Sequence, residues 1–351
     1  MTKGQFSLVS LQERPLVTFA LFAYNQEKYI REAVVGALTQ TYEPLEIILS
    51  DDCSTDSTFE IMKEMTKAYS GSHRITTIKQ PKNIGTIDHV LTVGEMSRGQ
   101  LIVVAAGDDV SLPERTEKIV ERWRLNDASV IYSGRVIVDE HGEELGVESL
   151  PEPMPKIQRI FEGTSCAKRY HGKVRNIPGY SAAYARKFLN EIPKCGSGAL
   201  NEDALTTVLA NLNSHEIDAI DLPLVKYRYA RTSISSRNNV LSMSSIKESE
   251  QRTVIFSCSS VKFYPYLFDV MKLSKTKKED LDLVAARLQE NYREAALIKG
   301  SAENNFFGRV RLLLACRSIG EFKIVASRVF GMECFSAIKF VVLKLKSNLT
   351  I

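Results

Sequence analysis

Apolar and polar residues follow two alternating periods over the first 125 residues. Continuous apolar runs of strand length occupy 16–22, 45–49 and 101–105, which is typical of strands buried on both faces. Between these runs, 27–38 and 57–69 repeat apolar residues at helical spacing. Strands that alternate with helices pair in parallel through right-handed crossovers. The pattern therefore predicts an open α/β sheet.

Four weaker signals extend this pattern. They predict a strand over 74–79, a helix over 86–96, a helix from Pro113 to Trp123, and a Ser57-x-x-Glu60 capping box that starts the helix after the second strand. Beyond these, strand and helix signals mix, with helical spacing at 182–189 and 202–212 and a turn-rich stretch over 139–155 that we expect to be a mobile loop.

After about residue 235 the composition changes. A Ser/Asn-rich linker over 233–245 precedes segments with helical spacing and no further strand signal. We therefore expect an α/β domain over 1–235, divided into two halves at about 16–125 and 126–235. The helical C-terminal region would cover 236–351.

Composition narrows the function classes. The chain has 351 residues and a formal net charge of +4, which is too small by itself to indicate a nucleic-acid partner. Its six cysteines form no Cys-x-x-Cys pair, so neither a zinc site nor a disulfide framework is expected. There is no signal-peptide pattern and no apolar run long enough to span a membrane. These features predict a cytoplasmic protein.

Basic residues concentrate near the C-terminus. Between Arg309 and Lys346 the chain carries eight Lys/Arg against two Asp/Glu, on segments that also have apolar faces. This combination is typical of helices that lie in a membrane interface, and equally of a packed helical cap with a solvated basic face. We expect 305–351 to be a candidate contact for an anionic membrane surface, at the inner face of the plasma membrane.

Two acidic turns follow the second and fourth predicted strands. The first contains Asp51, Asp52 and Asp56, and the second contains Asp108 and Asp109. Because the carboxyl ends of parallel strands meet at one edge of a sheet, both turns fall at the edge where such sheets bind ligands. Carboxylates facing one crevice repel each other unless a cation or N–H and O–H donors lie between them. A nucleotide sugar with a divalent metal supplies all of these.

Each acidic turn also has a simpler explanation. Asp and Ser after a strand are common helix caps, and the Asp108–Asp109 pair followed by Pro113 is compatible with the start of a helix. Similarly, Glu202 and Asp203 alone would be read as acids that stabilise a helix N-terminus, with Asn201 as its cap. Only the two acidic turns taken together favour a binding site.

Motifs in a fixed order cover about two-thirds of the chain. They are Tyr24-Asn25-Gln26-Glu27-Lys28-Tyr29-Ile30, Leu38-x-Gln40-Thr41-Tyr42, Leu45-Glu46-Ile47-Ile48, Asp51-Asp52-Cys53-Ser54-Thr55-Asp56, Asn83-Ile84-Gly85, Gly99-Gln100, Gly107-Asp108-Asp109-x-x-x-Pro113, Gly179-Tyr180-Ser181-Ala182-Ala183-Tyr184, Glu202-Asp203 and Tyr227-Arg228. This series resembles that of family 2 glycosyltransferases with the GT-A fold, a Rossmann-like, mostly parallel sheet flanked by helices. The resemblance implies that 16–125 is a nucleotide-sugar-binding half and 126–235 an acceptor half.

The resemblance implies an inverting glycosyltransferase of bacterial polysaccharide biosynthesis, and it implies roles for individual residues. Its donor would be a nucleotide-diphosphate sugar, with UDP expected, and its acceptor a saccharide or a lipid-linked saccharide. The nucleotide sugar would lie against Tyr24, Asp52, Asn83 and Asp108, with Tyr24 at the base and Asp52 accepting from the uracil imide. Asp203, with Glu202 beside it, would be the general base that deprotonates the acceptor hydroxyl.

The resemblance also implies Mg²⁺ or Mn²⁺, with Asp109 as the nearer ligand and Asp108 as a contact to the metal or the ribose. Two departures weaken this metal site. Many relatives have a further Asp where this chain has Ala106, and a His where it has Ala230. A metal held mostly by diphosphate remains compatible with the sequence, because Mg²⁺ commonly uses only one or two carboxylates.

Other protein classes use a similar α/β sheet or bind a similar ligand. A nicotinamide enzyme would need Gly-x-Gly-x-x-Gly after the first strand, where Tyr24-Asn25-Gln26 stands instead. A sugar nucleotidylyltransferase would need a Gly-rich basic loop at that position, and this loop is missing. A nucleotide-sugar-binding protein without turnover stays open, and Ala106 and Ala230 motivate it.

Overall fold

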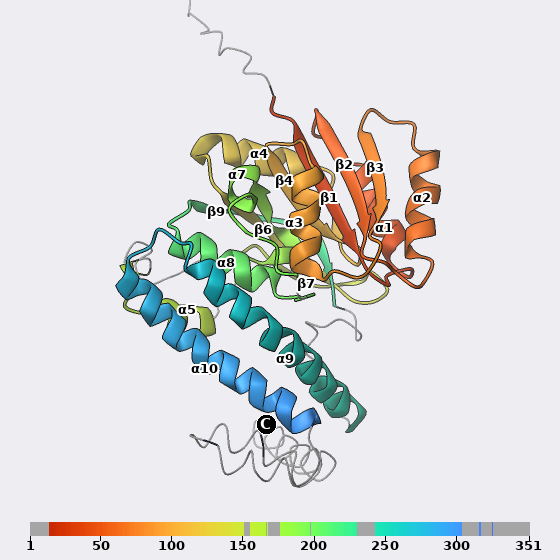
Figure 1. Ribbon diagram of the computed structural model, residues 1–351. Helices are drawn as coiled ribbons and strands as arrows, with labels where there is room; N and C mark the ends of the chain where they lie inside the picture. Colours follow the sequence, from red (N-terminus) through yellow and green to blue (C-terminus); the bar gives the residue numbers. More distant parts are fainter. Residues whose placement is uncertain are drawn as a thin grey trace, which may run out of the picture.

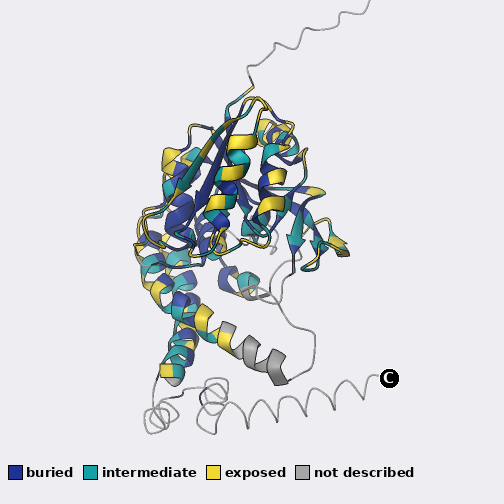
Figure 2. Cartoon of the chain, turned by 90° about the vertical axis from the view of Figure 1, so that its right-hand side faces the viewer, coloured by how far each residue is buried: buried dark blue, intermediate teal, exposed yellow. Residues whose placement is uncertain are grey.

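The computed structural model describes residues 14–150, 155–165, 167, 176–196, 198–229, 243–303, 316 and 325. Most of the predicted linker over 233–245 (residues 233–242), Ala230 and nearly all of the basic segment 305–351 lie outside these residues. Figure 1 shows a sheet with helices on its faces and two long helices below it. Figure 2 shows that the strands form the buried interior, while exposed residues gather on the outer faces of the helices.

The first half of the sheet is entirely parallel, as predicted. Its order is β3 (Arg74–Lys79), β2 (Leu45–Asp51), β1 (Val17–Ala23) and β4 (Leu101–Ala106). The central strands β1 and β2 are buried almost throughout, which explains their unbroken apolar sequences. The edge strand β3 is only partly buried, and it gave the weaker signal.

Three helices connect these strands, a fourth follows β4 and β5 (Val110–Ser111), and together the four cover both faces of the sheet. They are α1 (Ile30–Leu38), α2 (Thr58–Ala68), α3 (Thr86–Met96) and α4 (Arg115–Asn126). Apolar residues of α1, α2 and α4 share one core with one face of the parallel strands. Apolar residues of α3 share a second core with the other face. The two cores make a three-layered α/β architecture.

The second half of the sheet is mixed. The order continues from β4 through β8 (Ala183–Ala185), β6 (Val130–Val138) and β9 (Ile217–Arg228) to β5 (Val110–Ser111). Strands β6 and β9 are parallel, and the pairings of β8 with β4 and β6 and of β5 with β9 are antiparallel. Parallel ladders still contain most of the paired residues, so the predicted fold class is confirmed.

Three local predictions were wrong. The stretch over 139–155 contains a strand, β7 (Glu144–Glu148), which forms a hairpin with β6. The helical spacing over 182–189 belongs to β8 and a four-residue helix, α7 (Arg186–Leu189). Ser57 does precede α2, but it makes no side-chain cap; Asp56 Oδ1 accepts from the Thr58 N–H at 3.0 Å instead.

The helical extension is confirmed as a hairpin of α9 (Met243–Met271) and α10 (Lys278–Glu303) that crosses below the sheet (Figure 1). The short helix α5 (Pro155–Phe161) packs on α10, and Arg287 Nη1 of α10 donates to the Ile160 carbonyl at 3.0 Å. Helix α9 reaches the segment before α8 (Glu202–Leu212), since Ser259 Oγ accepts from the Leu200 N–H at 2.9 Å. Among the described residues, no helix has both the length and the apolar character needed to cross a membrane.

Candidate functional site

The two acidic turns lie at the same edge of the sheet, as predicted. In the parallel register Asp51 pairs with Ala23 and Ala106 pairs with Phe22, so β1, β2 and β4 end at nearly the same level. Strand β1 lies between β2 and β4, and the segment that follows it (24–28) therefore separates the two turns.

The 24–28 segment is bonded to the first acidic turn. The Asn25 N–H donates to Ser54 Oγ at 2.8 Å, and Asn25 Oδ1 accepts from the Thr55 N–H at 2.9 Å. Asn25 adopts a left-handed φ of 53°, which Asn tolerates better than most residues. These bonds fix the backbone next to Tyr24, whose side chain is left 46% exposed. An exposed ring on a fixed backbone suits the predicted contact with a base.

Asp52 is buried and bound to the protein's own backbone. Its carboxylate accepts from the Ile84 N–H at 2.8 Å and from the Gly85 N–H at 3.0 Å. Burial raises the pKa of Asp52, and the two N–H bonds oppose that rise. Asn83 beside these donors is exposed. Asp52 therefore orders the turn that precedes α3. Each of its oxygens keeps a second lone pair, and the contact of these with a base stays a prediction.

Asp108 and Asp109 differ in accessibility. Asp109 is buried, and its Oδ1 accepts from the Arg228 N–H at 2.8 Å. Burial and, next, the charge of Asp108 hold the pKa of Asp109 well above its usual range. Asp108 is half-buried and hydrogen-bonds Gln26; burial also raises its pKa. Of the pair, Asp108 has the more accessible carboxylate.

Gly107 makes room for the Gln26 contact. A Cβ at Gly107 would lie 2.4 Å from Gln26 Oε1 and 3.0 Å from the Ala23 Cβ. A glycine is therefore required where the second acidic turn meets the segment after β1.

Two buried arginines contact the acidic pair or its backbone: Arg228 belongs to the Tyr227-Arg228 motif, whereas Arg115 carried no signal in the sequence. Arg228 donates through Nε to the Asp108 carbonyl at 3.0 Å and through Nη2 to Glu32 Oε2 at 2.7 Å. Arg115 donates to Ser111 Oγ at 2.8 Å and to the Val104 carbonyl at 2.7 Å. Burial lowers the pKa of Arg115 to about 9, and the charge of Asp109 opposes this shift.

Glu202 and Asp203 begin helix α8 but occupy different environments. Glu202 is buried and accepts a hydrogen bond from the Tyr184 hydroxyl, and desolvation raises its pKa to about 7. Asp203 is exposed, yet the surrounding protein desolvates its carboxyl enough to raise its pKa. Asn201 makes no side-chain cap, because Ser259 Oγ donates to its Oδ1 at 3.0 Å. Of the two, only Asp203 is exposed, and its role as general base stays a prediction.

The metal prediction is supported only by the adjacent acids. Within the described ranges, no group of three or more His, Cys, Asp or Glu side chains is placed to hold a metal ion. Asp108 and Asp109 nevertheless fit a divalent ion whose remaining ligands come from a diphosphate, because a cation would stabilise the charged forms of two adjacent carboxyls whose pKa values burial raises. Asp109 has already committed one oxygen to Arg228.

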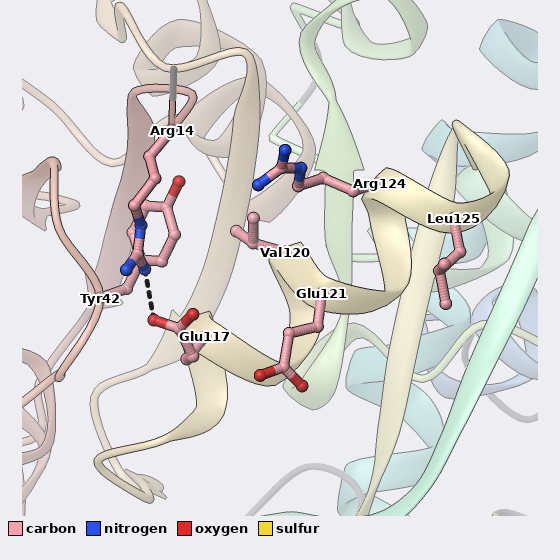
Figure 3. A pocket seen from close by; sticks show the side chains of 7 residues that line it. All are labelled: Arg14, Tyr42, Glu117, Val120, Glu121, Arg124 and Leu125. Atoms are coloured by element: carbon pink, nitrogen blue, oxygen red, sulfur yellow. Dashed lines mark hydrogen bonds and ion pairs between the residues drawn. The ribbon is translucent and has the colours of Figure 1, made fainter. Parts of the chain in front are cut away.

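A pocket of about 420 Å³ lies elsewhere in the molecule (Figure 3). It is lined by Tyr42 and by residues of α4, and Arg14 forms an ion pair with Glu117 across it. The Tyr42 hydroxyl donates to the Pro15 carbonyl, so this pocket adjoins the start of β1, at the opposite end of the strands from the acidic turns. None of the predicted site residues lines it.

Comparison with known proteins identifies the family. Residues 18–193, about half of the chain, match the family model for glycosyl transferase family 2. The chain belongs to this family. The matched residues of this family 2 chain contain both acidic turns and the segment after β1, and they end before Glu202 and Asp203.

Individual relatives agree with this assignment. The chain is 30% identical over 186 residues to the putative glycosyltransferase EpsE of Bacillus subtilis, which covers 51% of this chain and 64% of EpsE. It is 28% identical over 238 residues to the uncharacterized glycosyltransferase MJ1057 of Methanocaldococcus jannaschii, covering 67% and 76%. It is 32% identical over 142 residues to chondroitin synthase of Escherichia coli, covering 40% and 20%.

Solved structures resemble the chain more distantly. TarS 1–349 of S. aureus covers 89% of this chain and 82% of its own length, at 14% identity and a TM-score of 0.49. The mannosyltransferase PcManGT from Pyrobaculum calidifontis, solved with GDP-Man and Mn²⁺, covers 94% and 88%, at 14% identity and a TM-score of 0.48.

Proposed function

We propose that the chain is an inverting glycosyltransferase. It would transfer a sugar from a nucleotide-diphosphate donor, with UDP as the expected nucleotide, to a saccharide or lipid-linked acceptor of cell-surface polysaccharide synthesis. Family membership supports glycosyl transfer. One observation supports the site assignment. Strands β2 and β4 end at nearly the same level, so the two acidic turns that follow them lie at the same carboxyl edge of the sheet.

In this proposal the donor lies along the acidic edge. Tyr24, exposed beside a fixed backbone, contacts the base, and Asp52 and Asn83 border it. Asp108 binds the ribose or the metal side of the diphosphate, since its carboxylate is the accessible one of the pair. The burial of Asp109 favours Asp108 as the first metal contact, with Asp109 contributing the oxygen that Arg228 does not use.

Mg²⁺ or Mn²⁺ at Asp108 and Asp109 would neutralise charge on the departing nucleoside diphosphate. The protein's own contribution is to hold the two carboxylates in place. Arg228 binds both the Asp108 carbonyl and Asp109, and Gln26 bonds Asp108 across the space that Gly107 leaves.

Asp203 would act as the general base. Inversion requires an acceptor hydroxyl to lose its proton as its oxygen attacks the anomeric carbon, on the face opposite the departing diphosphate. The exposed Asp203 carboxylate can accept that proton, and its raised pKa makes it a stronger base than a solvated aspartate. Glu202 is buried against Tyr184, so we assign it a positioning role at the start of α8.

Release of UDP from a panel of UDP-sugars, with Mg²⁺ or Mn²⁺ added, tests this proposal. Turnover with at least one UDP-sugar supports it. Ala106, which stands at the end of β4 where many relatives have an Asp, favours a second candidate, a nucleotide-sugar-binding protein without turnover. Binding of UDP-sugars without release of UDP, under all metal conditions, would favour this second candidate and overturn the proposed transferase.

A further inference from the structure

Three half-buried side chains form a cluster beside the acidic pair, hereafter the Arg135–Tyr180–Tyr227 cluster. The Arg135 guanidinium carbon lies 4.9 Å from the Tyr180 ring centroid and 4.5 Å from that of Tyr227. The two tyrosine rings are 4.7 Å apart and inclined at 50°. The cluster draws one residue each from β6, the 3₁₀ turn η1 (Gly179–Ser181) and β9.

The fold assembles this cluster without a ligand. In the parallel register of β6 and β9, Ile137 pairs with Tyr227, so Arg135 points to the same face of the sheet two residues earlier. Arg135 Nε and Nη2 both lie 2.9 Å from Glu148 Oε2 on β7, which fixes the guanidinium plane. Its Nη1 has no hydrogen-bond partner within the described part of the chain. The Arg135 side chain is 21% exposed, so its guanidinium retains an N–H donor that a ligand can use.

The cluster lies between the two predicted catalytic features. Tyr227 immediately precedes Arg228, whose N–H binds Asp109. Burial raises the pKa of Tyr180, and the charge of Asp109 adds a small contribution, in keeping with a ring that contacts Tyr227 next to Arg228. On the other side, a Cβ at Gly179 would lie 3.6 Å from the Asp203 Cβ. A sugar that extends from the diphosphate site to the proposed general base, Asp203, would therefore contact these tyrosine rings.

We propose that the Arg135–Tyr180–Tyr227 cluster binds a pyranose ring of the saccharide acceptor; this inference rests on the proposed function. A pyranose has an apolar C–H face and a rim of hydroxyl groups. The tyrosine rings offer a matching apolar surface, and Arg135 Nη1 can donate to a rim oxygen. The donor sugar arrives held by its diphosphate, whereas the acceptor has no such anchor and needs a surface that holds its ring.

The test separates the acceptor from the donor. Saturation-transfer NMR with methyl β-D-glucopyranoside, methyl β-D-galactopyranoside and methyl β-N-acetylglucosaminide, in the presence of UDP and Mg²⁺, reports binding of the acceptor ring. Hydrolysis of a UDP-sugar, with water as the acceptor, reports the donor site. We expect Tyr180→Ala and Tyr227→Ala to weaken glycoside binding at least fivefold, and to leave UDP-sugar hydrolysis within twofold of wild type.

Two further variants control for packing. Tyr180→Phe keeps the ring and should retain glycoside binding, and Tyr69→Ala removes a tyrosine stacked on His73, far from the acidic edge, and should change neither readout. The proposal is overturned if Tyr180→Ala binds the glycosides like wild type, or if wild type binds none of them. It is also overturned if hydrolysis falls together with glycoside binding, because the rings would then hold the donor sugar. Absence of both UDP binding and hydrolysis in wild type would instead reject the proposed function, and this inference with it.

Discussion

The Arg228 N–H donates a 2.8 Å hydrogen bond to Asp109 Oδ1, joining residues that are far apart in the chain. The contact exists because the sheet curls: β5, which follows the second acidic turn directly, pairs with β9 at the far end of the strand order. The end of β9 therefore meets the turn after β4. The position of the acidic pair depends on this closure of the sheet.

Replacing Arg228 with Met should destabilise the fold by about 3 kcal/mol. The buried guanidinium donates to the carbonyls of Asp108, Asp139 and Glu140, and its loss leaves these acceptors without a partner. Urea denaturation measures the effect. Arg31→Met, which removes an exposed ion pair with Glu64, should change the stability far less, because water and salt screen an exposed pair. Equal losses in the two variants would contradict the structural role of Arg228.

Replacing Asp52 with Asn should cost about 1–3 kcal/mol of stability and weaken UDP binding. The carboxylate accepts one N–H on each oxygen, and an amide can accept only one and would set its own N–H₂ against the other donor. Chemical denaturation and calorimetric titration with UDP measure the two effects. Asp127→Asn, at an exposed ion pair with Lys187, is the matched control. An Asp52→Asn variant as stable as wild type would show that these bonds are dispensable.

Glu202→Gln should gain stability over wild type as the pH rises. Burial raises the pKa of Glu202 to about 7 in the folded chain, against an ordinary value of 4.5, so the folded state binds more protons than the unfolded state between these values. Stability of wild type therefore falls as the pH rises through this window, by at most about 3 kcal/mol, and the loss is complete above pH 7. Gln keeps the bond from Tyr184 without a charge. Denaturation at about pH 4 and pH 8 should show no gain at the lower pH and the full gain at the higher; a pH-independent difference would contradict the assignment.

Much of the donor half follows from the sequence alone. Unbroken apolar runs predict β1, β2 and β4, and parallel pairing then predicts that Asp51 and Asp108 follow strands that end at one edge. The partner of Asp52 could not be predicted, because backbone N–H groups of Ile84 and Gly85 carry no sequence signal. The mutual repulsion expected of the acidic turns is thus partly relieved by the protein's own N–H groups.

The second half of the α/β domain could not be predicted, for a different reason. Arg115 carries no signal in the sequence, and the Tyr227-Arg228 motif does not indicate that its arginine is buried; the curled sheet encloses both side chains. Glu202 and Asp203 are neighbours in one motif, but helix geometry turns the first toward Tyr184 in the core and leaves the second exposed. The burial of the arginines and the different environments of Glu202 and Asp203 both depend on contacts between residues far apart in the chain. The periodicity of the sequence does not encode such contacts.

Asp203→Asn should lower turnover by about 10²–10⁴-fold and leave UDP affinity within about twofold of wild type, because an amide cannot accept the acceptor proton. In wild type, the rate should fall as the pH drops through the raised pKa of Asp203, since the protonated carboxyl is not a base. Initial rates of transfer with pH measure both effects. Asp221→Asn, an exposed site on β9, should behave as wild type. An unchanged rate in Asp203→Asn would exclude it as the base.

Calorimetric titration of the chain with UDP, with and without Mg²⁺, tests the central claim most directly. The account predicts binding that strengthens with Mg²⁺ in wild type and in Asp203→Asn, and that weakens at least tenfold in Asp108→Asn and in Asp109→Asn. The dependence on Mg²⁺ should disappear in both of these variants. UDP binding that is unchanged by Asp108→Asn and by Asp109→Asn would contradict the claim that the acidic edge of the sheet holds the nucleotide diphosphate.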